Sequence, residues 1–220
     1  MATAMTFNSL RTDLKRYLER GSVVDPEVYA QLPTLINLAE RNIARGLKVL
    51  GTQNVVTSVP PTGGLIAGTS VYQKPDRWRS TISMNFGSGV TSNDRLFIFP
   101  RSYEYCRSYW PNSDTRGIPE FYCDYSNSHW LIVPTPIAAY PWEIIYYQQP
   151  PLLDAVNQTN WLTDYAPDAI LYRTLLDCEP FLKNDERIAT WEKLFGASMS
   201  MLDSEDMQRI IDRSVVRTKD

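Results

Sequence analysis

The first fifty residues carry the hydrophobic period of amphipathic helices. Apolar residues recur at steps of three and four over Thr6–Arg20, which predicts one helix. Asp25-Pro26 combines an N-cap residue with a proline at the first helical position, so a turn or short helix is expected to start there. We expect that segment to end before Pro33, and a second, long helix to run from Pro33 to about Leu50.

The same period returns in the last third of the chain. Pro167 stands near the first position of a predicted helix, and Pro180 is expected to kink or end it. A last helix is predicted from Glu186 to beyond Ile211. Helical segments therefore stand at both ends of the sequence.

Between them, the segment Gly117–Pro151 has the properties of β-structure. It contains eight aromatic residues, six of the fifteen prolines and no Lys or Arg. Two runs, Glu120–Asp124 and Trp130–Val133, flank polar turn residues, which is typical of a hairpin. A third run, Trp142–Gln149, is bounded by prolines, which cannot donate a hydrogen bond within a sheet. We therefore expect three consecutive antiparallel strands here.

Shorter β-segments precede this stretch. The predicted strands are Gln53–Val59, Val71–Gln73, Arg79–Phe86 and Arg95–Phe99, the last closed by Pro100. Ser102–Trp110 is predicted to form one or two helical turns. Short strands at this spacing indicate a β-sandwich or a small barrel.

This order of elements predicts an α+β fold. Amphipathic helices must bury their apolar stripes against one another, so residues 1–50 and 152–220 are expected to form one helical bundle domain. Residues 51–151 are then an inserted, antiparallel β-rich lobe, resembling a sandwich or a barrel.

The composition excludes several classes of protein. Hydrophobic residues make up 43% and charged residues 21%, as in an ordinary folded protein. The net charge of −3 argues against a general nucleic-acid binder, although brief contact with DNA is compatible with it. No apolar run could span a bilayer and no apolar signal segment precedes the first charges, so we expect no membrane partner and no export. An odd number of cysteines without a C-x-x-C pair predicts reduced, buried thiols at Cys106, Cys123 and Cys178.

Signatures of catalysis and of cofactor binding are weak. His129 is the one histidine, which argues against a zinc site, and no G-x-S-x-G motif accompanies it. A glycosidase-like pair could be drawn from Glu120, Asp124 and Glu143, yet all three also fit solvent-facing strand positions. Gly87-Ser88-Gly89 lacks the lysine of a phosphate-binding loop. We therefore expect no enzyme activity, no cofactor and no metal.

The aromatic residues of the lobe leave two interpretations open. Trp110, Trp130, Trp142 and Tyr147 are candidates for the lobe core and for a subunit interface, where Tyr and Trp are enriched. Trp130 and Trp142 lie near acidic residues, so they also suit stacking on sugars. The alternative function is therefore a carbohydrate-binding or glycan-cleaving domain.

Arginines are spaced by four residues near the C-terminus. On a continued helix they would form one face, here called the basic stripe: Arg209, Arg213 and Arg217. A solvated face is one interpretation of the basic stripe, and docking onto an acidic partner is the other.

Six short motifs follow one another along most of the chain: Leu32-Pro33-x-Leu35-Ile36-x-Leu38-Ala39-Glu40-x-x-Ile43, Gly117-Ile118-Pro119-x-x-Tyr122, Leu131-Ile132-Val133-Pro134-Thr135-Pro136, Tyr146-Tyr147-x-x-Pro150-Pro151-Leu152, Trp161-Leu162 and Ala166-Pro167-Asp168-Ala169-Ile170-Leu171-Tyr172. None is a catalytic signature. In these motifs and in their order the chain resembles the head-to-tail adaptor, connector or neck proteins of tailed bacteriophages.

The resemblance implies a non-enzymatic structural protein of the virion, assembled in the host cytoplasm. Such adaptors form a ring, usually of twelve copies, beneath the portal protein, and continue the channel through which genomic DNA passes. Their partners are the portal, further copies of the chain, and tail tube, nozzle or fibre proteins. The family's C-terminal segment often reaches the portal, which would assign portal docking to the basic stripe. A tail tube or tail-completion protein is the closer rival among virion proteins.

Overall fold

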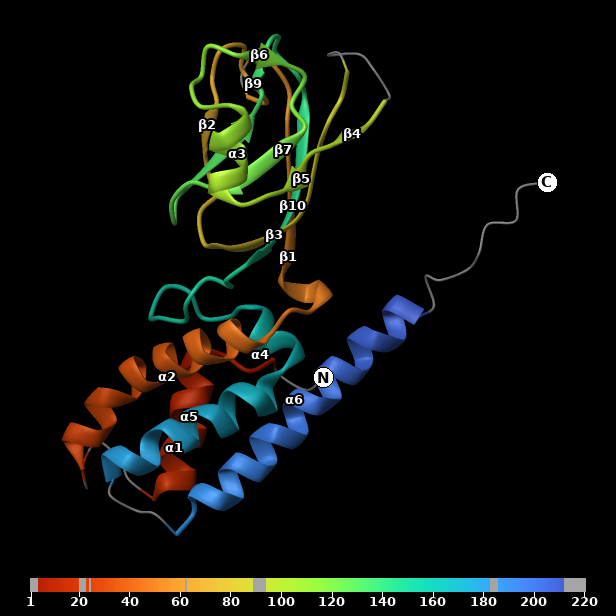
Figure 1. The fold of residues 1–220 in the computed structure, drawn as a ribbon. Coiled ribbons are helices and arrows are strands. Elements are labelled where there is room, and N and C mark those ends of the chain that lie inside the picture. The colour runs from red at the N-terminus through yellow and green to blue at the C-terminus, as the bar shows by residue number, and fades with distance from the viewer. Residues whose placement is uncertain are drawn as a thin grey trace. The chain divides into compact units, whose positions relative to one another are not determined.

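The computed structural model describes residues 4–19, 23, 25–61, 63–88, 94–182 and 186–211. The chain divides into two compact units (Figure 1). One contains Met1–Thr52 together with Gln149–Asp220, and the other contains Gln53–Gln148. The first unit is helical and the second is built mainly of strands, so the expected α+β fold is confirmed.

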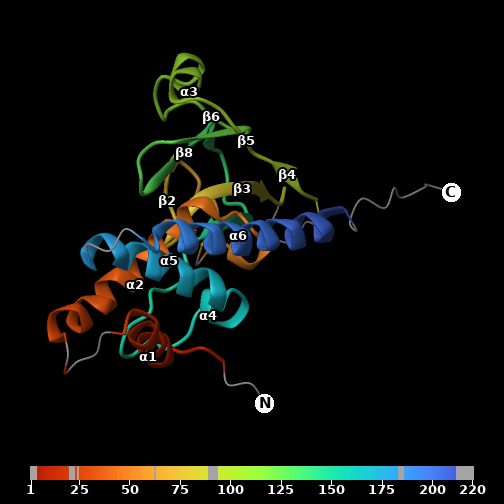
Figure 2. The ribbon, with the colours of Figure 1, turned by 90° about the horizontal axis from the view of Figure 1, so that it is seen from below.

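The helical unit takes its elements from both ends of the sequence. They are α1 (Phe7–Leu18), α2 (Pro26–Gly46), a 3₁₀ turn (Leu50–Thr52), α4 (Trp161–Tyr165), α5 (Pro167–Leu182) and α6 (Ile188–Ile211). Helix α5 packs against α1, α2, α4 and α6 (Figure 2). Their apolar stripes share one core, in which Leu10, Leu14, Ile36, Ile170 and Leu175 are fully buried.

Helix α1 begins at a reciprocal cap. The Thr6 hydroxyl accepts the backbone N–H of Ser9 at 3.1 Å, and the Ser9 hydroxyl accepts that of Thr6 at 2.8 Å. Two N–H groups that the first helical turn leaves without partners are satisfied in this way. The helix ends at Leu18, before the predicted Arg20, because Glu19 adopts a left-handed conformation with φ of 56°.

The prediction that a new helix starts at Pro33 is wrong, as α2 shows. Asp25 caps it as expected, but the helix is continuous through Pro33, which starts no new element, and it ends at Gly46 rather than near Leu50. An interior proline costs about 3 kcal/mol. Val28, Leu32 and Ile36 on both sides of it are all buried in the core, and this burial outweighs the cost.

Helix α5 likewise passes Pro180 and ends at Leu182. Helix α6 lies along it and is held by buried polar contacts as well as apolar ones. The Trp191 indole N–H donates to the Glu179 carboxylate at 2.8 Å, and the Ser198 hydroxyl donates to Asp168 at 2.5 Å.

The β unit contains two four-stranded sheets. The first has the order β1–β10–β3–β4, comprising Gln53–Ser58, Trp142–Gln148, Trp78–Phe86 and Leu96–Phe97. The second has the order β2–β8–β7–β5, comprising Val71–Gln73, His129–Val133, Phe121–Asp124 and Phe99–Pro100. A short parallel pair joins β6 (Arg116–Gly117) to β9 (Thr135–Pro136), and α3 (Tyr103–Tyr109) packs on β7.

The two sheets share one aromatic core, as in a sandwich. Trp130 of β8 and Trp142 of β10 meet edge to face, with ring centroids 6.3 Å apart. Phe86 and Tyr146 of the first sheet and Ile132 of the second belong to the same buried cluster. Over the described residues the strands close no barrel. Of the two predicted architectures, sandwich and barrel, the structure therefore has the sandwich.

The three predicted strands form, but they do not share one sheet. Strands β7 and β8 form the expected antiparallel hairpin, whereas β10 pairs antiparallel with β1 and β3 in the other sheet. Strand β10 buries alternate residues and so has one core face, whereas four of the five residues of β8 are buried. Because β10 faces β8 across the core, Trp142 covers Trp130.

The predicted strand Arg95–Phe99 is two strands. Leu96–Phe97 pairs with β3 in the first sheet, and Phe99–Pro100 pairs with β7 in the second. The pairing of Phe99–Pro100 is parallel, against the expectation of antiparallel strands throughout. Ile98, which is 3% exposed, is the buried residue at which the chain crosses between sheets.

Candidate functional site

The structure separates the residues that could have formed a catalytic pair. Asp124 is ion-paired with Lys74 at 2.7 Å, Glu143 accepts a hydrogen bond from the Asn85 side chain at 3.1 Å, and Glu120 lines a different groove. The His129 ring lies within 2.9 Å of the Ser128 hydroxyl, in the hairpin turn. Across the described parts of the chain, no group of three or more His, Cys, Asp or Glu is placed to hold a metal ion.

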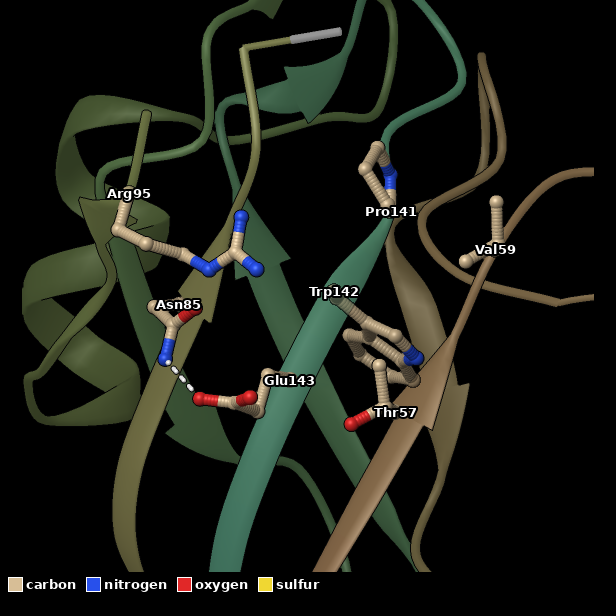
Figure 3. Close-up of a pocket in the computed structure, with 7 residues that line it drawn as sticks. All are labelled: Thr57, Val59, Asn85, Arg95, Pro141, Trp142 and Glu143. Carbon is tan, nitrogen blue, oxygen red and sulfur yellow. Dashed lines mark hydrogen bonds between the residues drawn. The ribbon is translucent and has the colours of Figure 1, made fainter. Parts of the chain in front are cut away.

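One small polar pocket lies on the first sheet (Figure 3). Thr57, Glu143 and Asn85 occupy paired positions on β1, β10 and β3, and the Arg95 guanidinium points toward them. Asn85 is 4% exposed, and neither its Oδ1 atom nor the indole nitrogen of Trp142 has a hydrogen-bond partner among the described residues. The pocket volume is about 120 Å³, below the roughly 300 Å³ at which pockets for drug-sized ligands begin. It has room for a few water molecules, at about 30 Å³ each.

The aromatic candidates divide between core and surface. Trp130 is 0% exposed and Trp142 8% exposed, so neither ring presents a free face on which a sugar could stack. Trp110 is half-buried, 5.9 Å from both Phe121 and Tyr109 in the ring contacts around α3. Tyr147 is half-buried on β10.

The basic stripe is only partly within the described residues. Arg209 lies near the end of α6, while Arg213 and Arg217 lie outside the described residues. The 24 residues of α6 correspond to a length of roughly 36 Å. Leu202 is half-buried and the three residues after it, Asp203–Glu205, are exposed.

The β4–β5 side of the sandwich exposes apolar residues, here called the apolar edge: Leu96, Phe97, Phe99 and Ile118. They are between 40% and 58% exposed and lie beside a groove of about 490 Å³, together with Arg95 and Glu120. An apolar patch of this kind on a folded protein marks an interaction surface. The sequence signal is the apolar run Leu96–Phe99, which lies within the single strand predicted over Arg95–Phe99.

The β1–β2 side of the same sandwich has an open hollow, defined by Val56, Gln73, Lys74, Pro75, Asp76, Trp142 and Ile144. Its volume is about 350 Å³. The Lys74 ammonium group is already engaged, since it donates to the Ser126 carbonyl at 2.9 Å and lies 3.7 Å from the centroid of the Trp78 ring. Asp76 is exposed at the hollow's rim.

A buried carboxylate in the helical unit was not recognised from the sequence. Glu40 of α2 is 3% exposed, and its oxygens accept the Leu153 backbone N–H at 3.1 Å and the Asn160 side-chain amide at 2.6 Å. Burial raises the pKa of Glu40 to about 7, and the two hydrogen bonds only partly offset that effect. Asn160 also caps α4, so Glu40 fixes the segment that returns from the β unit.

Comparison with models of protein families identifies a relationship. A family model described as SU10 adaptor protein matches residues 5–218. No curated protein matches the chain. None of the described helices is both long enough and apolar enough to cross a membrane.

Proposed function

The chain belongs to the SU10 adaptor protein family, a family of phage head-to-tail adaptors, and from this premise we propose that it forms a ring between portal and tail. The family itself implies a structural, non-enzymatic role and a place in the virion. The observation that carries the proposal is the extent of the match, because residues 5–218 include both units.

In this proposal twelve copies form the ring, and the helical unit contributes its body. The exposure of Asp203–Glu205 on α6 supports a docking role for the C-terminal segment. The basic stripe then binds an acidic surface of the portal, where opposite charge gives orientation and a fast encounter.

The ring continues the channel for DNA and offers its other face to tail tube, nozzle or fibre proteins. A net charge of −3 supports passage without retention, because tight binding of phosphates requires many cationic contacts. Assembly takes place in the host cytoplasm. The burial of Trp130 and Trp142 gives no support to the carbohydrate-binding alternative.

The test is complementation of a phage in which the gene for this chain is interrupted. We expect filled heads and free tail components that do not join, and infectious particles after the purified protein is added to the extract. Normal tailed particles without the gene product would overturn the proposal. Portal docking is tested separately with a variant in which each arginine of the basic stripe is changed to Glu. This variant is added to the same extract as the wild-type protein.

A further inference from the structure

We propose that neighbouring β units join edge to edge, with the apolar edge of one copy seated in the open hollow of the next. This inference rests on the proposed ring and specifies one of its contacts. The hollow takes residues from β1 and β2 and the apolar edge takes residues from β4 and β5, and in each sheet these strands are the two opposite end strands.

Several backbone donors of the apolar edge are already used. The backbone N–H groups of Ile98, Phe99 and Arg101 donate inward, to the carbonyls of Met84, Glu120 and Tyr122, at 2.9 Å each. Pro100 has no N–H to offer. Because strand addition needs a row of outward-facing donors, this edge is better suited to binding through its side chains.

Those side chains need an apolar surface with room for rings. Phe97 is 53% exposed and Phe99 58% exposed, and they belong to different sheets, so they project as a pair from the joint between the sheets. The open hollow has a volume of about 350 Å³, and its apolar lining is the half-buried Val56 beside Trp142 and Ile144, which are 8% and 1% exposed.

The charges around the two surfaces favour the same pairing. Arg95 is exposed beside the apolar edge, and Asp76 is exposed at the rim of the hollow. Arg77, the next residue along the chain, does not line the hollow, and the Lys74 ammonium is held by Asp124. In the proposed contact the Asp76 carboxylate pairs with Arg95 of the neighbouring copy, whose guanidinium turns away from Glu143 of its own sheet to reach it.

A second copy is the occupant because one chain supplies both halves of the contact. A contact between two different surfaces repeats from copy to copy and closes into a ring when the rotation allows it. An unrelated partner bound at the apolar edge would leave the hollow without a role.

The test is electron microscopy of rings formed on the portal protein of the same phage. Phe97→Asp with Phe99→Asp removes the apolar contact, and we expect each junction to weaken roughly a hundredfold, so that complete rings disappear. Ile137→Asp is the matched control, since Ile137 is 57% exposed and lines neither surface. Both proteins should melt at the wild-type temperature, because the substituted side chains are exposed.

A charge exchange tests the direction of the contact. Arg95→Asp and Asp76→Arg should each reduce ring formation about fivefold or more, and the double variant should return to within about twofold of wild type. Full rings from the Phe97/Phe99 variant would overturn this inference and leave the proposed function standing. Failure of the wild-type protein to form rings on the portal would overturn the proposed function itself, and this contact with it.

Discussion

The substitution Glu40→Gln should lower the unfolding free energy at pH 5 and raise it at pH 8. Burial of the Glu40 carboxylate raises its pKa from 4.5 to about 7. The folded chain therefore holds a proton that the unfolded chain releases, so folding is favoured most below pH 4.5. That stabilisation is lost as the pH rises through 7, and the difference between the two pKa values corresponds to roughly 3 kcal/mol.

The Gln side chain keeps the shape but cannot ionise. Its carbonyl can accept the bonds from Asn160 and Leu153, while its amide stands near the Leu153 N–H, another donor. This mismatch should cost about 1 kcal/mol at pH 5. At pH 8 the Gln variant avoids burying a charge, so it should be more stable than wild type.

The assay is urea unfolding followed by circular dichroism at 222 nm, which reports on the helical unit. Both proteins are measured at pH 5 and pH 8, so that contributions from other groups cancel, among them Asp177, whose pKa burial also raises. A difference in unfolding free energy between the two proteins that is the same at both pH values would refute the reasoning.

Three further outcomes are expected. Changing every arginine of the basic stripe to Glu should weaken binding to the portal at least tenfold in a pull-down, with an unchanged melting temperature, because surface charges contribute little to folding. Burial raises the pKa of Cys123 and of Cys178 to about 12. None of the three buried thiols should therefore react with an alkylating reagent at pH 8 until urea is added. Fast labelling of the native protein would contradict this expectation. Pro33→Ala should raise the unfolding free energy by about 1–3 kcal/mol, and a lower midpoint in urea would show that the ring of Pro33 has a packing role.

Local sequence signals predicted the elements that depend on local physics. The amphipathic period over Thr6–Arg20, the start signal Asp25-Pro26 and the polar turn between β7 and β8 led to α1, the start of α2 and a hairpin within a few residues of their bounds. The three cysteines are buried, as expected from their number and spacing.

The errors occurred where tertiary packing decides. Pro33 interrupts a helical pattern locally, but the stripe on both sides of it faces one core, so α2 continues. Arg95–Phe99 and Trp142–Gln149 were predicted correctly as extended segments, yet extended residues do not specify which sheet they join. That choice depends on the burial of Trp142 against Trp130, a contact between strands of different sheets.

The candidate site was the least predictable part. Glu40 appeared to be a polar helix residue, because its partners Leu153 and Asn160 stand more than a hundred positions away. The apolar edge could not be recognised from the sequence either. Phe97 and Phe99 are exposed because their strands stand at the ends of two sheets, and the sequence does not show that position.

The central claim is that this chain forms a ring on a portal. The direct measurement is electron microscopy of the purified protein mixed with the portal protein from the same phage, beside each protein alone. We predict a second ring stacked on the portal, with a symmetry that gives the copy number, even if the protein alone is a monomer. Portal rings that remain bare at saturating concentrations of the protein would contradict the account.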